Sequence, residues 1–171
     1  MQNYFELFDL KTCFFVDDDA LKKAYQTQVT RFHPDNFATK SQAKQLQALQ
    51  NTSLVNSAYT ALKTPLNRAS YLLNLEDVNP FDEKDTNMDT NFLVSQIELR
   101  EQLESIKEQQ DKLALDDFIE RVQDFIRDNV ASISEAFTQS RDLQKIKTLV
   151  RELKFYEQLN KEANILMDEW L

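Results

Sequence analysis

The sequence contains no glycine among its 171 residues, and it has only one cysteine, one histidine and three prolines. Phosphate-binding loops, dinucleotide-binding turns and nucleophile elbows need backbone conformations that glycine adopts most readily, so enzymes built on those motifs are excluded. The lone Cys13 can form neither an internal disulfide nor a thiolate cage around a metal, and it is typical of a small packing residue. We therefore expect no cofactor and no metal site.

Basic residues are also scarce, because 29 Asp and Glu stand against 20 Lys and Arg, a formal net charge of −9. Nucleic-acid binders gain much of their affinity by neutralising phosphates, so this balance argues against nucleic acid and favours a basic protein partner. No apolar run approaches the length of a membrane span, and Met1–Glu6 has the pattern of neither a secretory signal nor a transit peptide. We expect a cytoplasmic protein without a membrane partner.

Helices dominate the expected structure, since 42% of the residues are hydrophobic and they seldom alternate with polar ones. A first long helix runs from Asp19 to Phe32 and must end there, because Pro34 restricts the preceding residue and lacks an N–H. A second begins near Ser41 and packs antiparallel against it, which places His33 at the tip of a hairpin. The apolar face predicted for this second helix consists of Leu46, Leu49, Leu54, Ala58, Ala61 and Leu62.

The segment Asn79–Asn87 is polar and rich in turn formers, a composition typical of a linker rather than of an element that packs. From Asn91 onward, amphipathic helices broken near Asp111 and Ser140 predict a small bundle. The fold class is therefore all-α: an N-terminal helical hairpin domain over residues 1–75, a linker over 76–90 and a C-terminal three-helix bundle over 91–171.

The turn His33-Pro34-Asp35 is a weak signal by itself, and a solvated histidine beside a helix-ending proline is its usual explanation. Here it lies between two amphipathic helices, after the apolar segment 4–8 and before the segment 56–71. Pro34 restricts the directions in which His33 and Asp35 offer a donor and an acceptor. Such a turn is suited to perturbing a hydrogen-bond network in a partner.

At Lys22-Lys23-Ala24-Tyr25 and Arg31-Phe32-His33-Pro34-Asp35 the sequence resembles the J-domain family, and residues 56–71 resemble its third helix and exit. The resemblance implies that the first long helix docks on a DnaK-type chaperone while the turn promotes ATP hydrolysis, with no covalent chemistry by the J-protein itself. The docking residues would be Lys22, Lys23, Tyr25 and Arg31, although a basic helix face can also be merely solvated. Gln26, Thr27 and Asn36 replace residues that are commonly basic, so we expect a dedicated chaperone.

The helix that starts near Asn91 carries two apolar stripes when its positions are placed at about 100° per residue. Phe92, Leu99, Leu103 and Ile106 share one side and suit the bundle core. A second patch of Leu93, Val94 and Ile97 is flanked by Glu98, Glu101 and Glu104. An apolar patch rimmed by carboxylates is a candidate protein-binding surface, unless a neighbouring helix or the hairpin domain covers it.

Residues 92–103 and 150–159 resemble the HscB (Hsc20) family, and the match spans nearly the whole chain. The resemblance implies a co-chaperone of iron–sulfur cluster biogenesis that binds an IscU-type scaffold protein and brings it to the chaperone HscA. The implied scaffold-binding residues are Leu93, Val94, Ile97, Glu98, Glu101 and Phe155. Two positions depart from the family pattern, because Val94 is smaller than the usual Met and Ser105 replaces an acidic residue.

Two other readings stay open: a J-domain protein that serves a different client, and a helical adaptor without chaperone activity. Eukaryotic members of the family often add a Cys-rich zinc-binding region, so a chain with Cys13 alone indicates a bacterial cytoplasmic form. The oligomeric state also stays open, because the patch around Leu93 could equally pair two copies.

Overall fold

The computed structural model describes residues 3–85 and 88–171, which are helical with connecting turns and contain no strand. The chain divides into two compact units, Met1–Leu75 and Glu76–Leu171, each with its own helices and its own core. The all-α fold class predicted from the sequence is confirmed. None of the helices in the described ranges combines the length and the apolar character needed to cross a bilayer.

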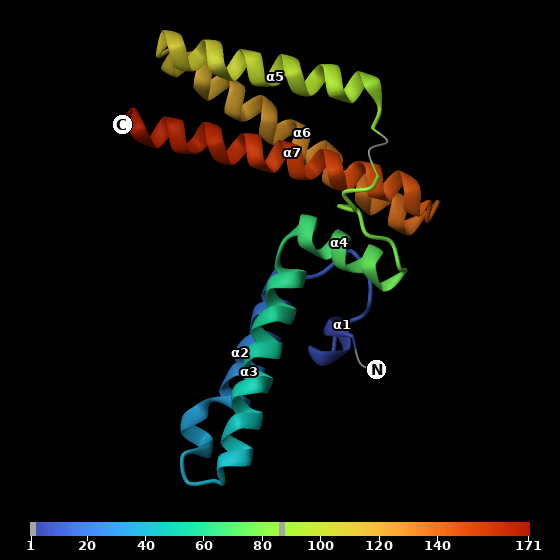
Figure 1. The fold of residues 1–171 in the computed structure, drawn as a ribbon, viewed down its shortest axis with the longest axis vertical. Coiled ribbons are helices and arrows are strands. Elements are labelled where there is room, and N and C mark those ends of the chain that lie inside the picture. The colour runs from blue at the N-terminus through green and yellow to red at the C-terminus, as the bar shows by residue number, and fades with distance from the viewer. Residues whose placement is uncertain (1–2, 86–87) are drawn as a thin grey trace. The chain divides into compact units, whose positions relative to one another are not determined.

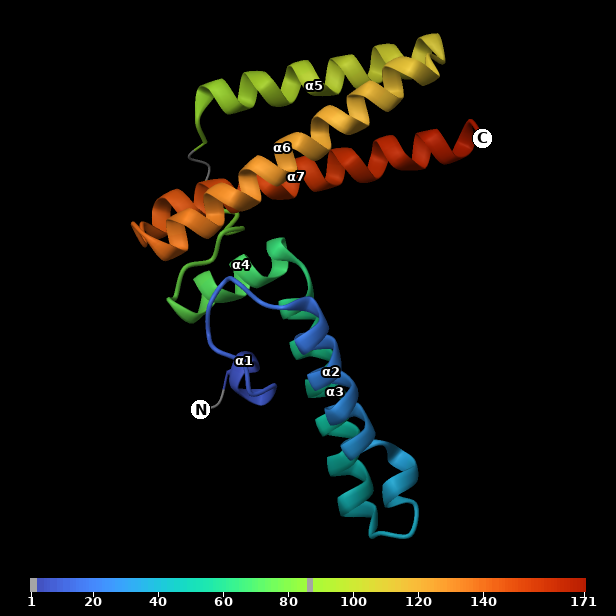
Figure 2. The ribbon, with the colours of Figure 1, turned by 180° about the vertical axis from the view of Figure 1, so that it is seen from behind.

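The N-terminal unit is built on an antiparallel pair of helices, α2 and α3, which lie side by side with a connecting turn at one end (Figures 1 and 2). Local capping sets their start points: the Asp17 carboxylate accepts the backbone N–H of Asp19 at 2.9 Å, and the Ser41 hydroxyl accepts that of Lys44 at 3.3 Å. The predicted hairpin is therefore present. Its elements are α1 Tyr4–Leu7, α2 Asp18–Phe32, the 3₁₀ helix η1 Pro34–Phe37, α3 Gln42–Lys63 and α4 Pro65–Leu75.

The buried face of α3 differs from the predicted one. Leu46, Leu49 and Leu54 are exposed to 57%, 58% and 46%, so their assignment to the core was wrong. The buried positions fall within about 80° of each other around the helix, and the three leucines lie about 80° or more from the centre of that arc. Small alanines in the buried arc let the two helices approach closely. The prediction placed the large leucine side chains in the core because of their size, and that was wrong. The buried residues are Ala48, Val55, Ala58 and Leu62.

A buried cation closes the other end of the hairpin. Arg68 of α4 is only 5% exposed; its Nε donates to the Leu62 carbonyl and one terminal nitrogen donates to the Phe14 carbonyl, both at 3.0 Å. Its guanidinium also lies 5.7 Å from the centre of the Phe14 ring. Burial lowers the pKa of Arg68, and the nearby Asp18 carboxylate opposes that shift. The two carbonyls and the ring bind the cation strongly enough to tie α4 to the loop ahead of α2.

The C-terminal unit is a three-helix bundle in which α5 lies along the long antiparallel pair α6 and α7 (Figures 1 and 2). Without glycine, the turn after α5 uses Gln110 in the left-handed region at φ 53°. Asp111 then caps α6 and Asp142 caps α7, close to the predicted breaks. The bounds are α5 Thr90–Gln109, α6 Lys112–Thr138 and α7 Leu143–Glu169. Their shared core contains Leu99, Leu115, Phe118, Ile119, Val122, Leu159, Ala163 and Leu166.

Parts of the segment before α5 contact α7, so the expectation that residues 79–87 do not pack was wrong for Pro80, Phe81 and Asp85, whereas Asn79 and residues 82–84 are exposed. Pro80 is buried despite its polar neighbours. Charge complementarity and an aromatic contact hold the segment, and neither is visible in its composition. The contacts are the Lys154 ammonium 4.4 Å from the Phe81 ring centre, and Asp85 paired with Lys147 and with Arg151. Thr86 and Asn87 lie outside the described residues.

Candidate functional site

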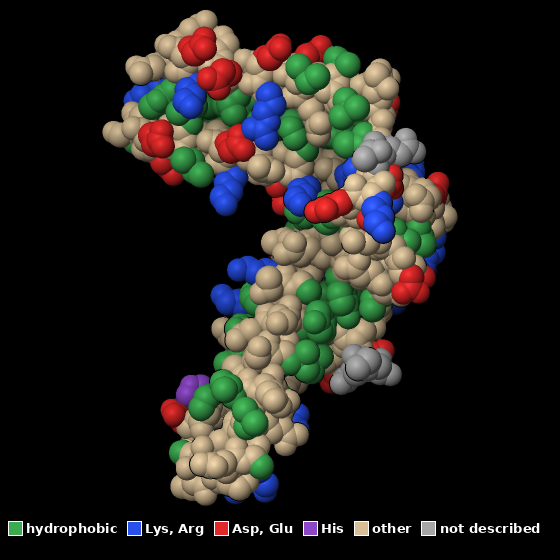
Figure 3. Space-filling model, in the orientation of Figure 1, with side chains coloured by type: hydrophobic (Ala, Val, Ile, Leu, Met, Phe, Trp, Pro, Cys, Tyr) green, Lys and Arg blue, Asp and Glu red, His purple; other side chains and the backbone are tan. Residues whose placement is uncertain are grey.

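The His33-Pro34-Asp35 turn, called the His-Pro-Asp turn below, follows the last residue of α2 directly. His33 ends the helix in an extended conformation, and Pro34 opens the 3₁₀ helix η1. The Nδ1 atom of His33 accepts the backbone N–H of Asp35 at 3.2 Å, so a neutral imidazole carries its proton on Nε2. Both side chains are accessible, at 52% and 90% exposure, and the histidine is visible at the surface (purple in Figure 3). The turn thus presents a donor and a carboxylate acceptor outward.

Two side chains anchor this turn through backbone carbonyls at the C-terminal end of α2. Asn36 Nδ2 donates to the Thr30 carbonyl at 2.7 Å, and the Thr52 hydroxyl of α3 shares its one proton between the Phe32 carbonyl at 3.0 Å and the Ala48 carbonyl at 2.9 Å. The last carbonyls of a helix lack partners within that helix. The Thr30 carbonyl accepts the His33 N–H at 3.4 Å, and Asn36 adds a second, shorter bond to it. The sequence alone indicated Asn36 as a loop residue and as a replacement for a commonly basic one. Its side chain in fact holds the turn against the helix.

The basic residues predicted for chaperone docking are spread over about half of the circumference of α2. Lys22, Lys23 and Arg31 are all exposed. At about 100° per residue, Lys22 and Arg31 point about 180° apart, with Lys23 between them. The face between them is a shallow hollow lined by Lys23, Gln26, Thr27 and Thr30. The positive charge on α2 therefore extends across this hollow, with Lys23 in its lining and Lys22 and Arg31 on either side.

Tyr25, the fourth predicted docking residue, is half-buried between the helices of the hairpin. Its hydroxyl donates to Asn56 Oδ1 at 2.6 Å, and its ring stacks on Tyr59 with 4.1 Å between ring centres. These contacts tie α2 to α3 near the middle of the hairpin. Tyr25 therefore has a packing role, and only the exposed part of its ring is available to a partner.

In α5, the two predicted stripes are confirmed as a buried side and an exposed side. Phe92 and Leu99 are buried in the bundle, whereas Leu93, Val94 and Ile97 are 40%, 49% and 58% exposed. Apolar side chains on a helix normally turn inward, so three neighbours on the outside indicate a contact surface. We call this surface the α5 face; it consists of Leu93, Val94, Ile97, Glu98 and Glu101, all exposed. Its role in binding stays a prediction.

Phe155 of α7 is half-buried beside α5. Its ring meets Phe92 edge to face, with 5.8 Å between the ring centres. The Arg100 guanidinium lies 5.5 Å from the centre of the same ring and forms an ion pair with Glu162. Arg100 and Glu162 escaped the sequence reasoning, because 62 positions separate them and each reads as an ordinary surface charge.

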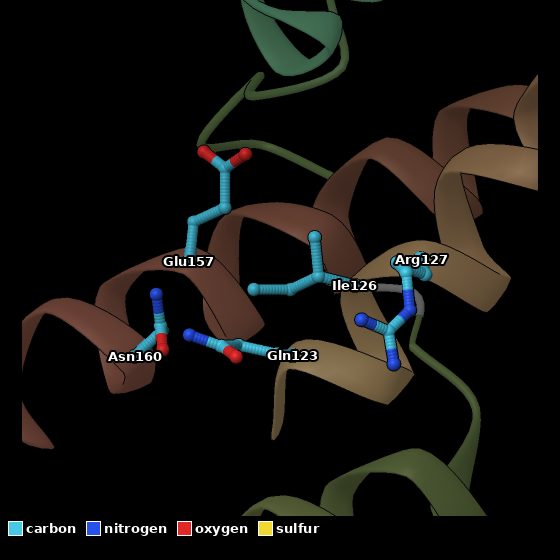
Figure 4. A pocket seen from close by; sticks show the side chains of 5 residues that line it. All are labelled: Gln123, Ile126, Arg127, Glu157 and Asn160. Atoms are coloured by element: carbon cyan, nitrogen blue, oxygen red, sulfur yellow. The ribbon is translucent and has the colours of Figure 1, made fainter. Parts of the chain in front are cut away.

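A shallow groove between α6 and α7 is lined by Gln123, Ile126, Arg127, Glu157 and Asn160. Figure 4 shows the amide groups of Gln123 and Asn160 pointing toward one another from the two helices, with the Glu157 carboxyl directed away from them. Burial raises the pKa of Glu157, but the groove supplies neither a histidine nor a nucleophile as its partner. In the part of the chain that the structure describes, no three His, Cys, Asp or Glu side chains gather as metal ligands.

A second carboxyl group of α7 has a perturbed pKa. Burial raises the pKa of Glu152, and the Asp89 carboxylate at the start of α5 adds to that shift. Asp89 is the residue that caps α5 by accepting the Asn91 N–H at 3.1 Å. The charged form of Glu152 is therefore disfavoured at the place where α5 begins.

Each of the two units matches a protein-family model. A model described as "DnaJ domain" matches residues 3–71, and one described as "HSCB C-terminal oligomerisation domain" matches residues 88–164. The "Co-chaperone protein HscB homolog" of Aliivibrio fischeri is 37% identical over 170 residues, covering 99% of each chain. The homolog from Vibrio campbellii has the same identity and coverage. The sequence similarity therefore runs through both units.

Solved structures give the same result for the fold. The structure titled "Chaperone HscB from Vibrio cholerae" matches with a TM-score of 0.89 and 38% identity, covering 99% of this chain and 100% of that one. The human co-chaperone protein HscB also matches with a TM-score of 0.89, at 28% identity over 96% of this chain and 82% of the human chain. Both helical units are thus shared with proteins from distant organisms.

Proposed function

The chain belongs to the HscB family of J-domain co-chaperones, and from this premise we propose that it serves iron–sulfur cluster biogenesis in a bacterial cytoplasm. It binds an IscU-type scaffold protein, delivers it to an HscA-type chaperone and stimulates the ATPase of that chaperone. The chain itself carries out no covalent chemistry, and it needs neither nucleic acid nor a membrane. Its two partners are proteins.

The observation that carries this proposal is the exposed, anchored His-Pro-Asp turn. His33, whose Nε2 is the available donor, and the Asp35 carboxylate are accessible on a turn that Asn36 ties to α2, and the Thr52 hydroxyl reaches the end of α2 from α3. A donor and an acceptor held in fixed directions lose little conformational freedom on binding, so they can act on a hydrogen-bond network in the chaperone. Docking is assigned to residues along α2, the helix that ends at the turn: Lys22, Lys23, Tyr25 and Arg31.

The client site is assigned to the α5 face together with Phe155. An apolar centre with a carboxylate rim suits a partner that offers apolar side chains beside basic ones, and in such surfaces the buried apolar contacts supply most of the affinity. The scaffold-binding residues are thus Leu93, Val94, Ile97, Glu98, Glu101 and Phe155. Delivery follows because this site and the activating turn lie on one chain.

A different client for the same mechanism is the second candidate. It is favoured by Val94 and Ser105, which depart from the usual Met and acidic residue at the family's scaffold-binding helix. The hollow on α2, with Gln26 and Thr27 at its centre, favours a dedicated chaperone in either case. The two candidate functions therefore differ in the client protein that is bound and not in the chaperone that is stimulated.

Single-turnover ATP hydrolysis by an HscA-type chaperone tests the proposal. The chaperone is mixed with this protein alone, with an IscU-type scaffold alone, or with both proteins together. We expect full stimulation only when both proteins are present. His33→Gln should remove the stimulation, whereas Thr39→Ala, an exposed change beside the turn, should not. If His33→Gln stimulated as well as the original chain, the turn mechanism would be wrong; stimulation that ignores the scaffold would favour another client.

A further inference from the structure

Arg100 lies on the exposed side of α5, inside the surface assigned to the client. At about 100° per residue it lies about 20° from Leu93 and about 60° from Ile97 around the helix. Its guanidinium pairs with the Glu162 carboxylate of α7 and lies against the Phe155 ring. One side chain therefore contacts an ion-pair partner and an aromatic ring at the centre of the proposed site.

We propose that Arg100 and Glu162 form a clamp that positions Phe155 for the client and keeps the α5 face negative. This inference rests on the client site of the proposed function. It makes Arg100 and Glu162 determinants of specificity for a partner with basic residues around an apolar contact. Neither residue belongs to the positions implied by the family resemblance.

The positioning part of the clamp follows from the contacts of Phe155. The ring meets Phe92 on one side and the Arg100 guanidinium on another, so it is held between a buried aromatic and a cation. Arg100 and Glu162 are both about two-fifths exposed. Cation–π contacts and ion pairs at such exposure contribute little to stability. The clamp therefore fixes the direction of a ring more than it stabilises the bundle.

The charge part follows from the carboxylates around the apolar patch. Glu98 and Glu101 are exposed on α5, and Arg100 lies at the edge of the α5 face, about 100° from Glu101 around the helix. An unpaired Arg100 would add a positive charge at that edge. Glu162 supplies a counter-charge from the neighbouring helix, so the face keeps its negative field. For a basic partner, a negative field speeds association and has less influence on the lifetime of the complex.

Removing the charge of Glu162 and removing the charge of Arg100 should consequently affect the association rate differently. Glu162→Gln leaves the Arg100 charge uncompensated and makes the face less negative, so association should slow. Arg100→Met keeps an apolar stem over Phe155 but removes a positive charge, so association should stay equal or become faster. Both variants lose the ion pair that holds the ring, so dissociation should become faster in both. A purely structural role would change dissociation alone.

The bundle offers matched controls on the other flank of α5. Arg121 of α6 lies 5.7 Å from the Phe118 ring centre and donates to Gln102 of α5 at 2.6 Å. Arg121→Met therefore removes a comparable clamp away from Phe155. Asp124→Asn removes the same charge as Glu162→Gln, because Asp124 pairs with Arg127 on the exposed surface of α6. Both controls should bind as the original chain does.

The experiment measures association and dissociation rates with an IscU-type scaffold at low and at physiological salt. We expect Glu162→Gln to slow association about twofold to threefold at low salt, with a smaller difference at higher salt, because salt screens the effect. Dissociation should become about fivefold faster for Arg100→Met, a typical loss for one supporting interface contact. Rates for both clamp variants equal to those of the two controls would overturn the inference.

A second measurement separates this inference from the proposed function. Proton NMR of the free protein reports the Phe155 ring through its chemical shifts and its contacts with Phe92. Arg100→Met and Glu162→Gln should change these signals, and Arg121→Met should not. If the original chain failed to bind the scaffold, the proposed client would be wrong, and an unchanged Phe155 ring in both clamp variants would independently refute the positioning role.

Discussion

The two units hold their candidate functional groups by different means. In the N-terminal unit, three consecutive residues form the His-Pro-Asp turn, and Asn36 and Thr52 anchor it through backbone carbonyls. In the C-terminal unit, the groups are spread along α5 and α7, and side-chain contacts such as Arg100 with Glu162 hold them. Because the turn consists of three consecutive residues, the loss of His33 should remove its function at once, whereas a dispersed face should weaken stepwise.

The largest effect is expected from replacing Arg68, which should unfold the N-terminal unit and leave the C-terminal unit folded. Arg68→Met leaves the Leu62 and Phe14 carbonyls buried without their donors, a cost of about 3 kcal/mol. That is a large part of the stability of a small domain. Circular dichroism melting should show an early transition, ATPase stimulation should disappear, and scaffold binding should persist. Loss of scaffold binding as well would show that the units do not fold independently.

Next in size is the stepwise weakening of the α5 face. Leu93→Ala/Ile97→Ala removes two exposed apolar side chains, and we expect scaffold affinity by calorimetry to fall about 10-fold to 100-fold. The double variant should still melt like the original chain. Leu113→Ala, a change of an even more exposed apolar side chain on α6, is the control. Unchanged affinity in the double variant would move the client site elsewhere.

A smaller effect is expected at the anchor of the turn. Asn36→Asp removes the donor to the Thr30 carbonyl and places a negative charge at the negative end of α2. ATPase stimulation should fall several-fold while His33 and Asp35 remain in place. Thr39→Asp adds the same charge nearby without touching that bond, so it should retain more of the stimulation. Equal losses in the two variants would mean that charge, and not anchoring, matters.

The smallest effect concerns pH and the bundle. Because burial and Asp89 raise the pKa of Glu152 above its ordinary value near 4.5, the folded chain keeps this proton to a higher pH than the unfolded chain does. The free energy of unfolding therefore falls as the pH rises from the pKa of Glu152 in the unfolded chain to its pKa in the folded chain. At neutral pH the cost of burying the ionised carboxylate applies in full. Glu152→Gln should raise the Tm by about 2 °C at pH 7 and leave it unchanged near pH 4. A Tm gain of equal size at both values would contradict the assigned cause.

Local sequence signals predicted the helices well, because caps and prolines act over a few residues. Asp17, Ser41 and Asp111 begin helices, and Pro34 follows the end of α2, as their chemistry requires. Long-range packing was predicted less well. The buried side of α3 follows small alanines that let α2 approach, and the exposed Leu46 and Leu49 gave the opposite impression.

The same limit applies to the candidate site. The His-Pro-Asp turn is contiguous, so one stretch of sequence contains all of it. The clamp between Arg100 and Glu162, and the pairing of Asp85 with Lys147, join residues that are each 62 positions apart. Such pairs carry no local pattern, because exposed charges on helices are common and most are only solvated. Their partners become visible once the three helices of the bundle are in place.

The central claim is that one chain couples the activating turn to the client face. The direct test mixes two variants: His33→Gln, which keeps the α5 face, and Leu93→Ala/Ile97→Ala, which keeps the His-Pro-Asp turn. It measures single-turnover ATP hydrolysis by an HscA-type chaperone in the presence of the scaffold. Coupling within one chain predicts that the equimolar mixture stimulates no more than the sum of the two variants measured separately. Stimulation by the mixture equal to that of the original chain would contradict the account.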